Sequence, residues 1–477
     1  MKANLTIWLI LVFFTSACVN GTPAGNDHSI KDTTKRAGFS ASVLFGAGKV
    51  IDSVICQSDP SQSYALYIPE KGNGTPLPII YFFDPHASGA LPLYKYRSLA
   101  DTYGFILVGS NDSKNGNDYT MAEHIWQSLS SDTKNRLKID NRRIYTAGFS
   151  GGAKVAVYLA LQHPEVKGVI ANGAGLPDGT PAGDFTFSFT AIAGYGDMNL
   201  TELIAISNDL ENTRTRHRII CFDGIHEWAP VNSMNLAFAG LQFDAMQQAL
   251  IPGDKSLIDS YVTASKKRLD SCYQTGQLIK AGQECALSIH VLDGVTNETG
   301  WFREKAAAIA KDPGFQKQRL SQEALLIREE SLQREYMQHF LQPDPQYWNN
   351  TISDLQSKAS AKTPAGLMYQ RLLAFVSLSF YSISNQMIRD NMNREALPLV
   401  ESYKTADPTN PEAWYFSAIL NARNGHGQAA EEDLLKAVGL GFKDLSRIRQ
   451  QREFQNLSPA INFSRIEQGM SAAGRAE

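Results

Sequence analysis

The stretch RIYTAGFSGGAKVAVYLAL, residues 143–161, decides the fold of this chain. Residues 143–147 form a run typical of a buried strand, and residues 153–161 read as a helix. Between them lies the pentapeptide GFSGG, residues 148–152, which fits the G-x-S-x-G pattern. Such a turn brings strand and helix close together in a strained backbone, which residues without a Cβ tolerate best. The sequence therefore predicts a nucleophile elbow at Ser150.

Two further polar residues follow apolar runs downstream of the serine. Asp197 ends the apolar run 190–197, and His226 follows the strand-like run 218–222 after a short turn. In an open parallel sheet the side chains that form a site gather beyond the strand ends. The chain order serine, aspartate, histidine is that of the α/β-hydrolases.

The three residue types predict a division of roles. A serine hydroxyl is a weak nucleophile at neutral pH, so an adjacent base must take its proton. We expect His226 to be that base and then the acid that protonates the leaving group. Asp197 would hold the imidazole in the required tautomer and stabilise its charged form.

The negative oxygen formed during acyl transfer needs backbone N–H donors. The amide of Gly151, directly after the serine, is the first candidate. The second should come from residues 84–89, the loop after the predicted strand 77–83. Pro85 has no N–H, so the second donor is expected near His86. Trp228, two residues past the histidine, is a candidate for substrate binding, with packing against its own loop as the alternative.

With these residues in place, the region 64–230 resembles the α/β-hydrolase esterases related to polyhydroxybutyrate depolymerase and feruloyl esterase. The segments that carry the resemblance are residues 63–69, 139–152 and 224–228. The resemblance implies catalytic roles for Ser150, Asp197 and His226. This chain departs from the family at the oxyanion loop, where Asp84-Pro85-His86 replaces the usual His-Gly.

The chain has 477 residues, which predicts two or three domains. The net charge of −3 gives no electrostatic reason to expect nucleic acid as a partner. The predicted organisation is a signal peptide (1–18), a flexible tether (19–39), an α/β-hydrolase domain (40–252), a helical connecting region (253–364) and a tetratricopeptide-like helical domain (365–477).

The N-terminus reads as an export signal. A single lysine precedes the apolar run 5–14, which is too short to span a bilayer comfortably, and small residues lead to Cys18. This resembles a bacterial lipoprotein signal, so Cys18 is the expected lipidation site and the only membrane anchor. A plain secretory signal is the alternative. Either signal predicts export, to the periplasm, the outer membrane or the cell surface.

The other cysteines and the histidines give no metal signature. An exported protein permits a disulfide between Cys272 and Cys285, and unpaired, mostly buried thiols are an equally good interpretation. Neither a C-x-x-C nor an H-E-x-x-H pattern occurs, so neither a metal nor another cofactor is expected. His217, between two arginines, is expected to be exposed near the start of a strand.

From residue 235 onward the apolar spacing is helical, apart from one strand-like run at residues 286–292. The final hundred residues fit a tetratricopeptide repeat, whose paired helices need small residues where they cross. The matching positions are Trp414, Ala418, Gly425, Ala430, Leu434 and Ala437, preceded by Phe380, Ala396 and Pro408. Three roles for this array are left open: recruitment of a protein partner, structural support of the hydrolase, or formation of one wall of the active-site cleft.

The sequence thus predicts an exported serine hydrolase that cleaves small-molecule or polymer-linked carboxylic esters through an acyl-enzyme. A serine peptidase of the same fold is an alternative, because the triad chemistry is the same for amides. A second alternative is a catalytically silent, envelope-anchored binding protein that works through its helical repeats.

Overall fold

The computed structural model describes residues 45–70, 74–341, 344–457 and 461–473. Cys18, the predicted signal peptide and the predicted tether lie outside these ranges. No helix within the described ranges combines the length and the apolarity needed to cross a membrane.

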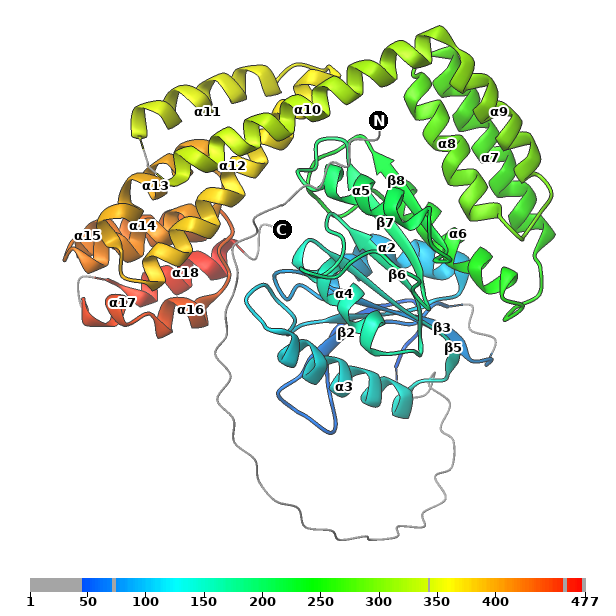
Figure 1. Ribbon diagram of the computed structural model, residues 1–477. Coiled ribbons are helices and arrows are strands. Elements are labelled where there is room, and N and C mark those ends of the chain that lie inside the picture. Colours follow the sequence, from blue (N-terminus) through cyan, green and yellow to red (C-terminus); the bar gives the residue numbers. More distant parts are fainter. Residues whose placement is uncertain (1–44, 71–73, 342–343, 458–460, 474–477) are drawn as a thin grey trace, which may run out of the picture. The chain divides into compact units, whose positions relative to one another are not determined.

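One eight-stranded sheet forms the first part of the chain (Figure 1). Its strands, in chain order, are β1 (Val50–Ile55), β2 (Ser63–Tyr67), β3 (Leu77–Phe83), β4 (Ile106–Ser110), β5 (Ile139–Phe149), β6 (Val166–Asn172), β7 (Ser188–Gly194) and β8 (His217–Phe222). Their spatial order is β1-β2-β4-β3-β5-β6-β7-β8. Strand β2 is antiparallel to both its neighbours, and every pairing from β4 to β8 is parallel.

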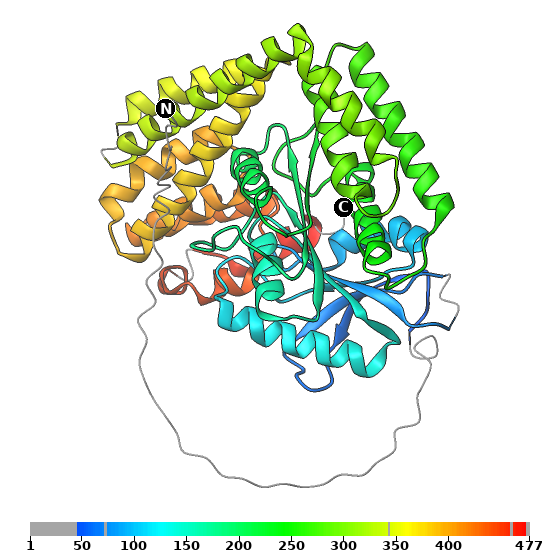
Figure 2. The same ribbon diagram turned by 45° about the vertical axis from the view of Figure 1, so that its right-hand side comes forward.

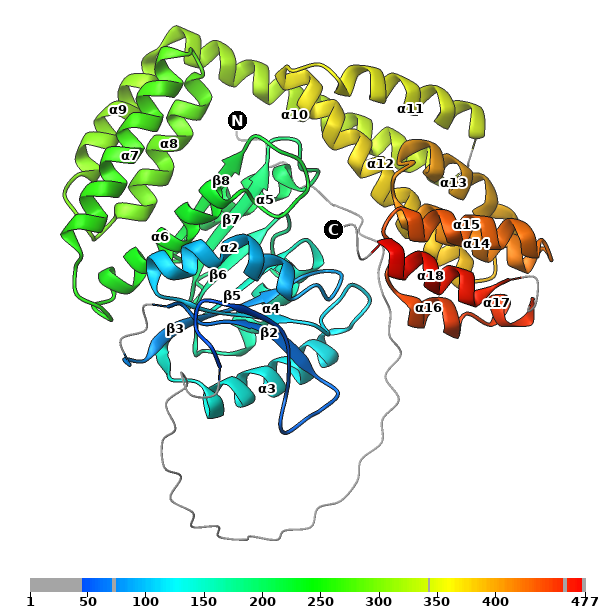
Figure 3. The same ribbon diagram turned by 180° about the vertical axis from the view of Figure 1, so that it is seen from behind.

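Helices cover both faces of this sheet (Figures 1 and 3). They are α2 (Ala90–Tyr103), α3 (Tyr119–Arg136), α4 (Gly151–Gln162), α5 (Leu200–Leu210) and α6 (Val231–Gln247). Helices α2 and α6 contribute to the core on one face, and α3, α4 and α5 contribute to the core on the other. A parallel sheet needs such cover because both its faces are apolar.

This sheet, with its elbow between β5 and α4, is an α/β-hydrolase fold, as the sequence predicted. The predicted strands 77–83, 143–147 and 218–222 are confirmed as parts of β3, β5 and β8, and the helix at 153–161 is confirmed as part of α4.

A helix-rich region follows the sheet. Its helices are α7 (Lys255–Gln274), α8 (Leu278–Leu292), α9 (Thr299–Lys311), α10 (Pro313–Leu341), α11 (Pro345–Ala359), α12 (Pro364–Arg389), α13 (Asn393–Ala406), α14 (Pro411–Arg423), α15 (Gly427–Gly439), α16 (Leu445–Gln450), α17 (Arg452–Asn456) and α18 (Phe463–Ala473). Helices α7, α8 and α9 lie side by side (Figure 2) and share a core with the sheet face that α2 and α6 cover. The helices from α10 to α18 contribute to a separate hydrophobic core.

The strand expected at residues 286–292 is wrong, because this run lies inside α8. A short apolar run does not distinguish a buried strand from a buried helix. The longer pattern does, since Ala281, Cys285, Ser288 and Leu292 are all buried at spacings of three and four residues.

Two further predictions concern the helical region and its cysteines. The small residues Ala418, Ala430 and Ala437 are fully buried where α14 and α15 pack together, as a repeat of paired helices requires. The tetratricopeptide assignment itself stays a prediction.

Cys272 and Cys285 are free thiols, so the structure contains the unpaired alternative and not the disulfide.

The elbow depends on glycines whose neighbours leave no room for a side chain. A Cβ on Gly152 would overlap the carbonyl oxygen of Phe83, and a Cβ on Gly148 would overlap the carbonyl oxygen of Gly152. Helix α4 therefore approaches β3 and β5 more closely than any residue with a side chain allows.

We predict that Gly152→Ala destabilises the protein by at least about 1–3 kcal/mol, the usual cost of overpacking. Alanine favours a helix over glycine, so a loss must come from the steric clash. Urea unfolding measures the effect. Gly183→Ala is the control, since a Cβ there meets nothing within 4 Å, and it should stay within about 0.5 kcal/mol of wild type. Equal stability of the two variants would contradict the prediction.

Candidate active site

Ser150 occupies the strained turn between β5 and α4. Its φ of 53° and ψ of −124° are unusual for a residue with a side chain. Its own amide donates to the carbonyl oxygen of Asn172 at the end of β6, at 2.9 Å. The structure thus has the strained strand-to-helix turn that the sequence predicted at Ser150.

The structure brings the three predicted residues into one hydrogen-bonded chain. His226 Nε2 lies 2.9 Å from Ser150 Oγ, and His226 Nδ1 lies 2.9 Å from Asp197 Oδ1. Asp197 is fully buried, while 18% of the His226 side chain is exposed. All three follow the carboxyl ends of β5, β7 and β8, so the topology of the sheet collects them at one edge.

The neighbourhood of Asp197 fixes the direction of its carboxylate. The amide of Asn199 donates to Asp197 Oδ1 at 2.9 Å, and the Asn199 side chain donates to the carbonyl oxygen of Gly173 at 2.7 Å. Gly173 has a φ of 67°, and a Cβ there would lie 3.1 Å from both Asp197 Oδ2 and His226 Cε1. Burial raises the pKa of Glu202, whose carboxyl acts electrostatically with Asp197 from α5.

Asn172 is a positioning residue that the sequence analysis missed. Its side chain accepts from the amide of Ala229 at 2.7 Å and donates to the carbonyl oxygen of Glu227 at 3.2 Å. The backbone of Asn172 also holds Ser150, so one buried residue ties the serine turn to the histidine loop. No local sequence pattern indicates this role, because Glu227 and Ala229, which the Asn172 side chain contacts, are distant in sequence.

The two predicted oxyanion donors have different surroundings. Gly151 is the first residue of α4, where an amide has no partner within its own helix and the helix dipole favours negative charge. The amide of His86 donates instead to Asp84 Oδ1 at 2.8 Å. In this structure the Asp84 side chain therefore accepts from the N–H that an oxyanion would need, and the assignment of His86 to an oxyanion site stays a prediction. The His86 side chain is 79% exposed.

Trp228 packs inside the protein and presents little surface to a substrate. It is 6% exposed and contacts the rings of Phe82, Tyr96 and Phe149. Its indole N–H donates to Asp84 Oδ2 at 2.8 Å. The packing alternative therefore describes Trp228 in this structure, and Asp84 joins the loop after β3 to the loop that carries His226.

Asn115 lies beside Gly151, the residue after Ser150, and was not singled out from the sequence. Its side chain occupies the space that a Cβ on Gly151 would take. The backbone N–H of Asn115 donates to the carbonyl oxygen of Pro85 at 2.8 Å. Asn115 comes from the loop after β4 and is exposed. Oδ1 of this carboxamide lies nearest to Gly151, and an exchange of Oδ1 and Nδ2 by rotation of the side chain would turn an N–H toward the start of α4.

The helical region reaches the loop that carries Asp197. The guanidinium of Arg371, on α12, donates to the carbonyl oxygen of Tyr195 at 2.7 Å. The same side chain pairs with the carboxylate of Glu329, on α10, at 2.9 Å. Arg371 and Glu329 are 6% and 1% exposed. Two helices from the second half of the chain thus brace the acid loop.

Comparisons with known proteins give fold-level likenesses only. No protein-family model matches the chain, and no curated protein matches its sequence. Similar solved structures include an esterase from Pyrobaculum calidifontis, with 15% identity and a TM-score of 0.34 over 42% of this chain and 85% of the esterase. An S-formylglutathione hydrolase from Agrobacterium tumefaciens has 16% identity and a TM-score of 0.32, and the match covers 41% of this chain and 93% of that hydrolase. A ferulic acid esterase has 16% identity and a TM-score of 0.32, and the match covers 41% of this chain and 97% of that esterase.

We predict that Arg371→Ala destabilises the protein by about 3–5 kcal/mol, because it leaves the buried carboxylate of Glu329 without its partner. The double variant Arg371→Met with Glu329→Leu should recover part of this loss, since it removes both charges. Urea unfolding of the two variants measures the difference. A double variant no more stable than the single one would show that the buried charge is not the cause.

Proposed function

We propose that this protein is a serine hydrolase that cleaves carboxylic esters through an acyl-enzyme intermediate. The observation that carries the proposal is the hydrogen-bonded chain from Ser150 through His226 to Asp197, with both distances at 2.9 Å. The strained backbone at Ser150, which presents its hydroxyl at the turn, supports the same role.

The proposed reaction proceeds in two halves. Ser150 Oγ attacks the ester carbonyl carbon while its proton passes to His226 Nε2. The tetrahedral intermediate collapses, His226 returns the proton to the departing alcohol, and the acyl group stays on Ser150. A water molecule then attacks the acyl-enzyme with His226 as base, releasing the acid and restoring the serine. Asp197 accepts from Nδ1 throughout and stabilises the imidazolium.

The oxyanion would be stabilised by two donors of different kinds. The first is the Gly151 amide at the start of α4. We assign the second to the carboxamide of Asn115, because the amide of His86 is engaged by Asp84. An asparagine side chain serves this purpose as well as a backbone amide, provided that it is held in place. The backbone N–H of Asn115 donates to the carbonyl oxygen of Pro85, which fixes the part of the loop that carries this side chain.

The substrate and setting are proposed more broadly. The ester preference follows the resemblance in the region 64–230, and polymer-linked esters suit a protein exported through the signal that ends at Cys18. The helices from residue 365 onward would brace the hydrolase, and a partner-binding role for them is a separate proposal. Peptide bonds are the competing substrate class, since the same triad cleaves amides.

Fluorophosphonate labelling tests the nucleophile. The purified wild-type protein should be modified at Ser150, with the peptide identified by mass spectrometry, and Ser150→Ala should abolish the label. Ser58→Ala, which removes an exposed serine, is the matched control and should label like wild type. With p-nitrophenyl acyl esters, Ser150→Ala should lower kcat by at least about 10⁴-fold. Unchanged ester hydrolysis in Ser150→Ala would refute the proposal.

We also predict that Asn115→Ala lowers kcat by about 10²–10³-fold with little change in KM, the usual result of removing one oxyanion donor. Asn117→Ala, which alters the same loop at a side chain bonded to Asp112, is the control and should change kcat only slightly. Steady-state kinetics with one ester would measure both variants. A kcat for Asn115→Ala equal to that of the control would remove Asn115 from the oxyanion site.

A further inference from the structure

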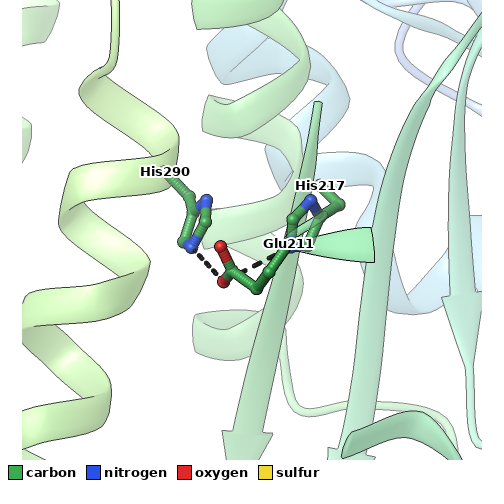
Figure 4. Close-up of side chains that lie close together, drawn as sticks. All are labelled: Glu211, His217 and His290. Atoms are coloured by element: carbon green, nitrogen blue, oxygen red, sulfur yellow. Dashed lines mark ion pairs between the residues drawn. The ribbon is translucent and has the colours of Figure 1, made fainter. Parts of the chain in front are cut away.

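Three possible metal ligands, Glu211, His217 and His290, lie close together (Figure 4). His217 is the first residue of β8, Glu211 directly follows α5, and His290 lies on α8. The triad residues follow the carboxyl ends of their strands, whereas His217 stands at the amino end of β8. This cluster is therefore separate from the proposed active site.

His217 has the arrangement of a metal-binding histidine. Its Nδ1 lies 3.0 Å from the carbonyl oxygen of Thr215, which can only accept, so Nδ1 carries the proton. In the neutral imidazole with this tautomer, Nε2 carries the lone pair. The side chain is 5% exposed, and Nε2 has no hydrogen-bond partner among the described residues. A backbone carbonyl that fixes the tautomer in this way is a common second contact of metal-bound histidines. The expectation that His217 is exposed is wrong.

The lone pair of His217 faces a carboxylate and not a donor. Glu211 Oε1 lies 3.5 Å from His217 Nε2 and 2.9 Å from His290 Nε2, and the three ligand atoms all lie within 4.8 Å of one another. Ligands at about 2.0–2.1 Å from a tetrahedral zinc ion are about 3.3 Å apart. Two electron-rich atoms face each other across this gap, and a cation between them would satisfy both.

The surroundings favour a bound metal ion. The three residues border a cavity of about 510 Å³ that none of the triad residues lines, so it can supply a water molecule to an open coordination position. Arginines Arg214, Arg216 and Arg303 also line this cavity. These arginines form ion pairs with Asp184, Asp244 and Asp293. The carboxylate of Glu211 instead lies next to His217 and His290.

We propose that Glu211, His217 and His290 bind a divalent zinc ion. Two imidazole nitrogens and one carboxylate oxygen are ligands that zinc prefers, with a water completing the tetrahedron. Since His217 belongs to the sheet and His290 to α8, the ion would join the first helices of the helical region to the hydrolase core. The sequence carries no metal motif because each ligand comes from a different element.

Zinc binding by the purified, EDTA-treated protein tests this proposal. Calorimetric titration with ZnCl₂ should give one ion per chain, and Co²⁺ should give the visible absorption of a tetrahedral site. Glu211→Gln and His290→Gln should each weaken zinc binding by roughly 100-fold or more and abolish the rise in Tm that zinc causes in wild type. Glu211 is half exposed, so its variant should remain folded, which circular dichroism would verify.

His124→Gln is the matched control, because His124 pairs with a single carboxylate, that of Asp59, at 2.9 Å. It should bind zinc like wild type, and so should Ser150→Ala, which separates this test from the proposed catalysis. Equal zinc affinity in Glu211→Gln, His290→Gln and wild type would overturn the proposal, and so would the absence of stoichiometric binding to wild type.

Discussion

The close approach of α4 to β3 and β5 is the constraint on which the rest of the structure depends. Gly148 and Gly152 permit this approach, and the turn between strand and helix then has no relaxed conformation available to Ser150. Ser150 stands at this turn, directly before the first residue of α4, and its hydroxyl lies within hydrogen-bonding distance of His226. The adjacent strands β6, β7 and β8 complete the arrangement, since their ends supply the residues that surround Ser150.

The site is held together by contacts between loops and not by any single element. Asn172 connects the serine turn with the histidine loop, and Asp84 connects the oxyanion loop with Trp228. Arg371 connects the acid loop with the helical region. Each connector is buried and bonds to groups that a solvent molecule would otherwise have to satisfy. The geometry of the triad is therefore a property of the whole described chain from β3 to α12.

The sequence predicted what local patterns encode. The elbow at Ser150, the strands β3, β5 and β8, and the positions of Asp197 and His226 follow from runs of a few residues. The prediction failed at residues 286–292, where a short apolar run suggested a strand although the longer pattern of buried residues is helical. The sequence analysis also did not consider that the Asp84 side chain accepts from the His86 amide two residues further on. Asn172, Asn115, Arg371 and the environment of His217 carried no local signal, because their contacts join segments far apart in the chain.

The contact between Arg371 and Tyr195 has a consequence for the order in which this protein matures on the ribosome. The chain is synthesised from its N-terminus, so the sheet, Ser150, Asp197 and His226 emerge long before α12. The carbonyl oxygen of Tyr195 and the carboxylate of Glu329 both accept hydrogen bonds from the guanidinium of Arg371, which is synthesised after them. The loop that carries Asp197 thus reaches its final restraint only when most of the polypeptide has been made, and a nascent or truncated chain holds all three triad residues without that restraint.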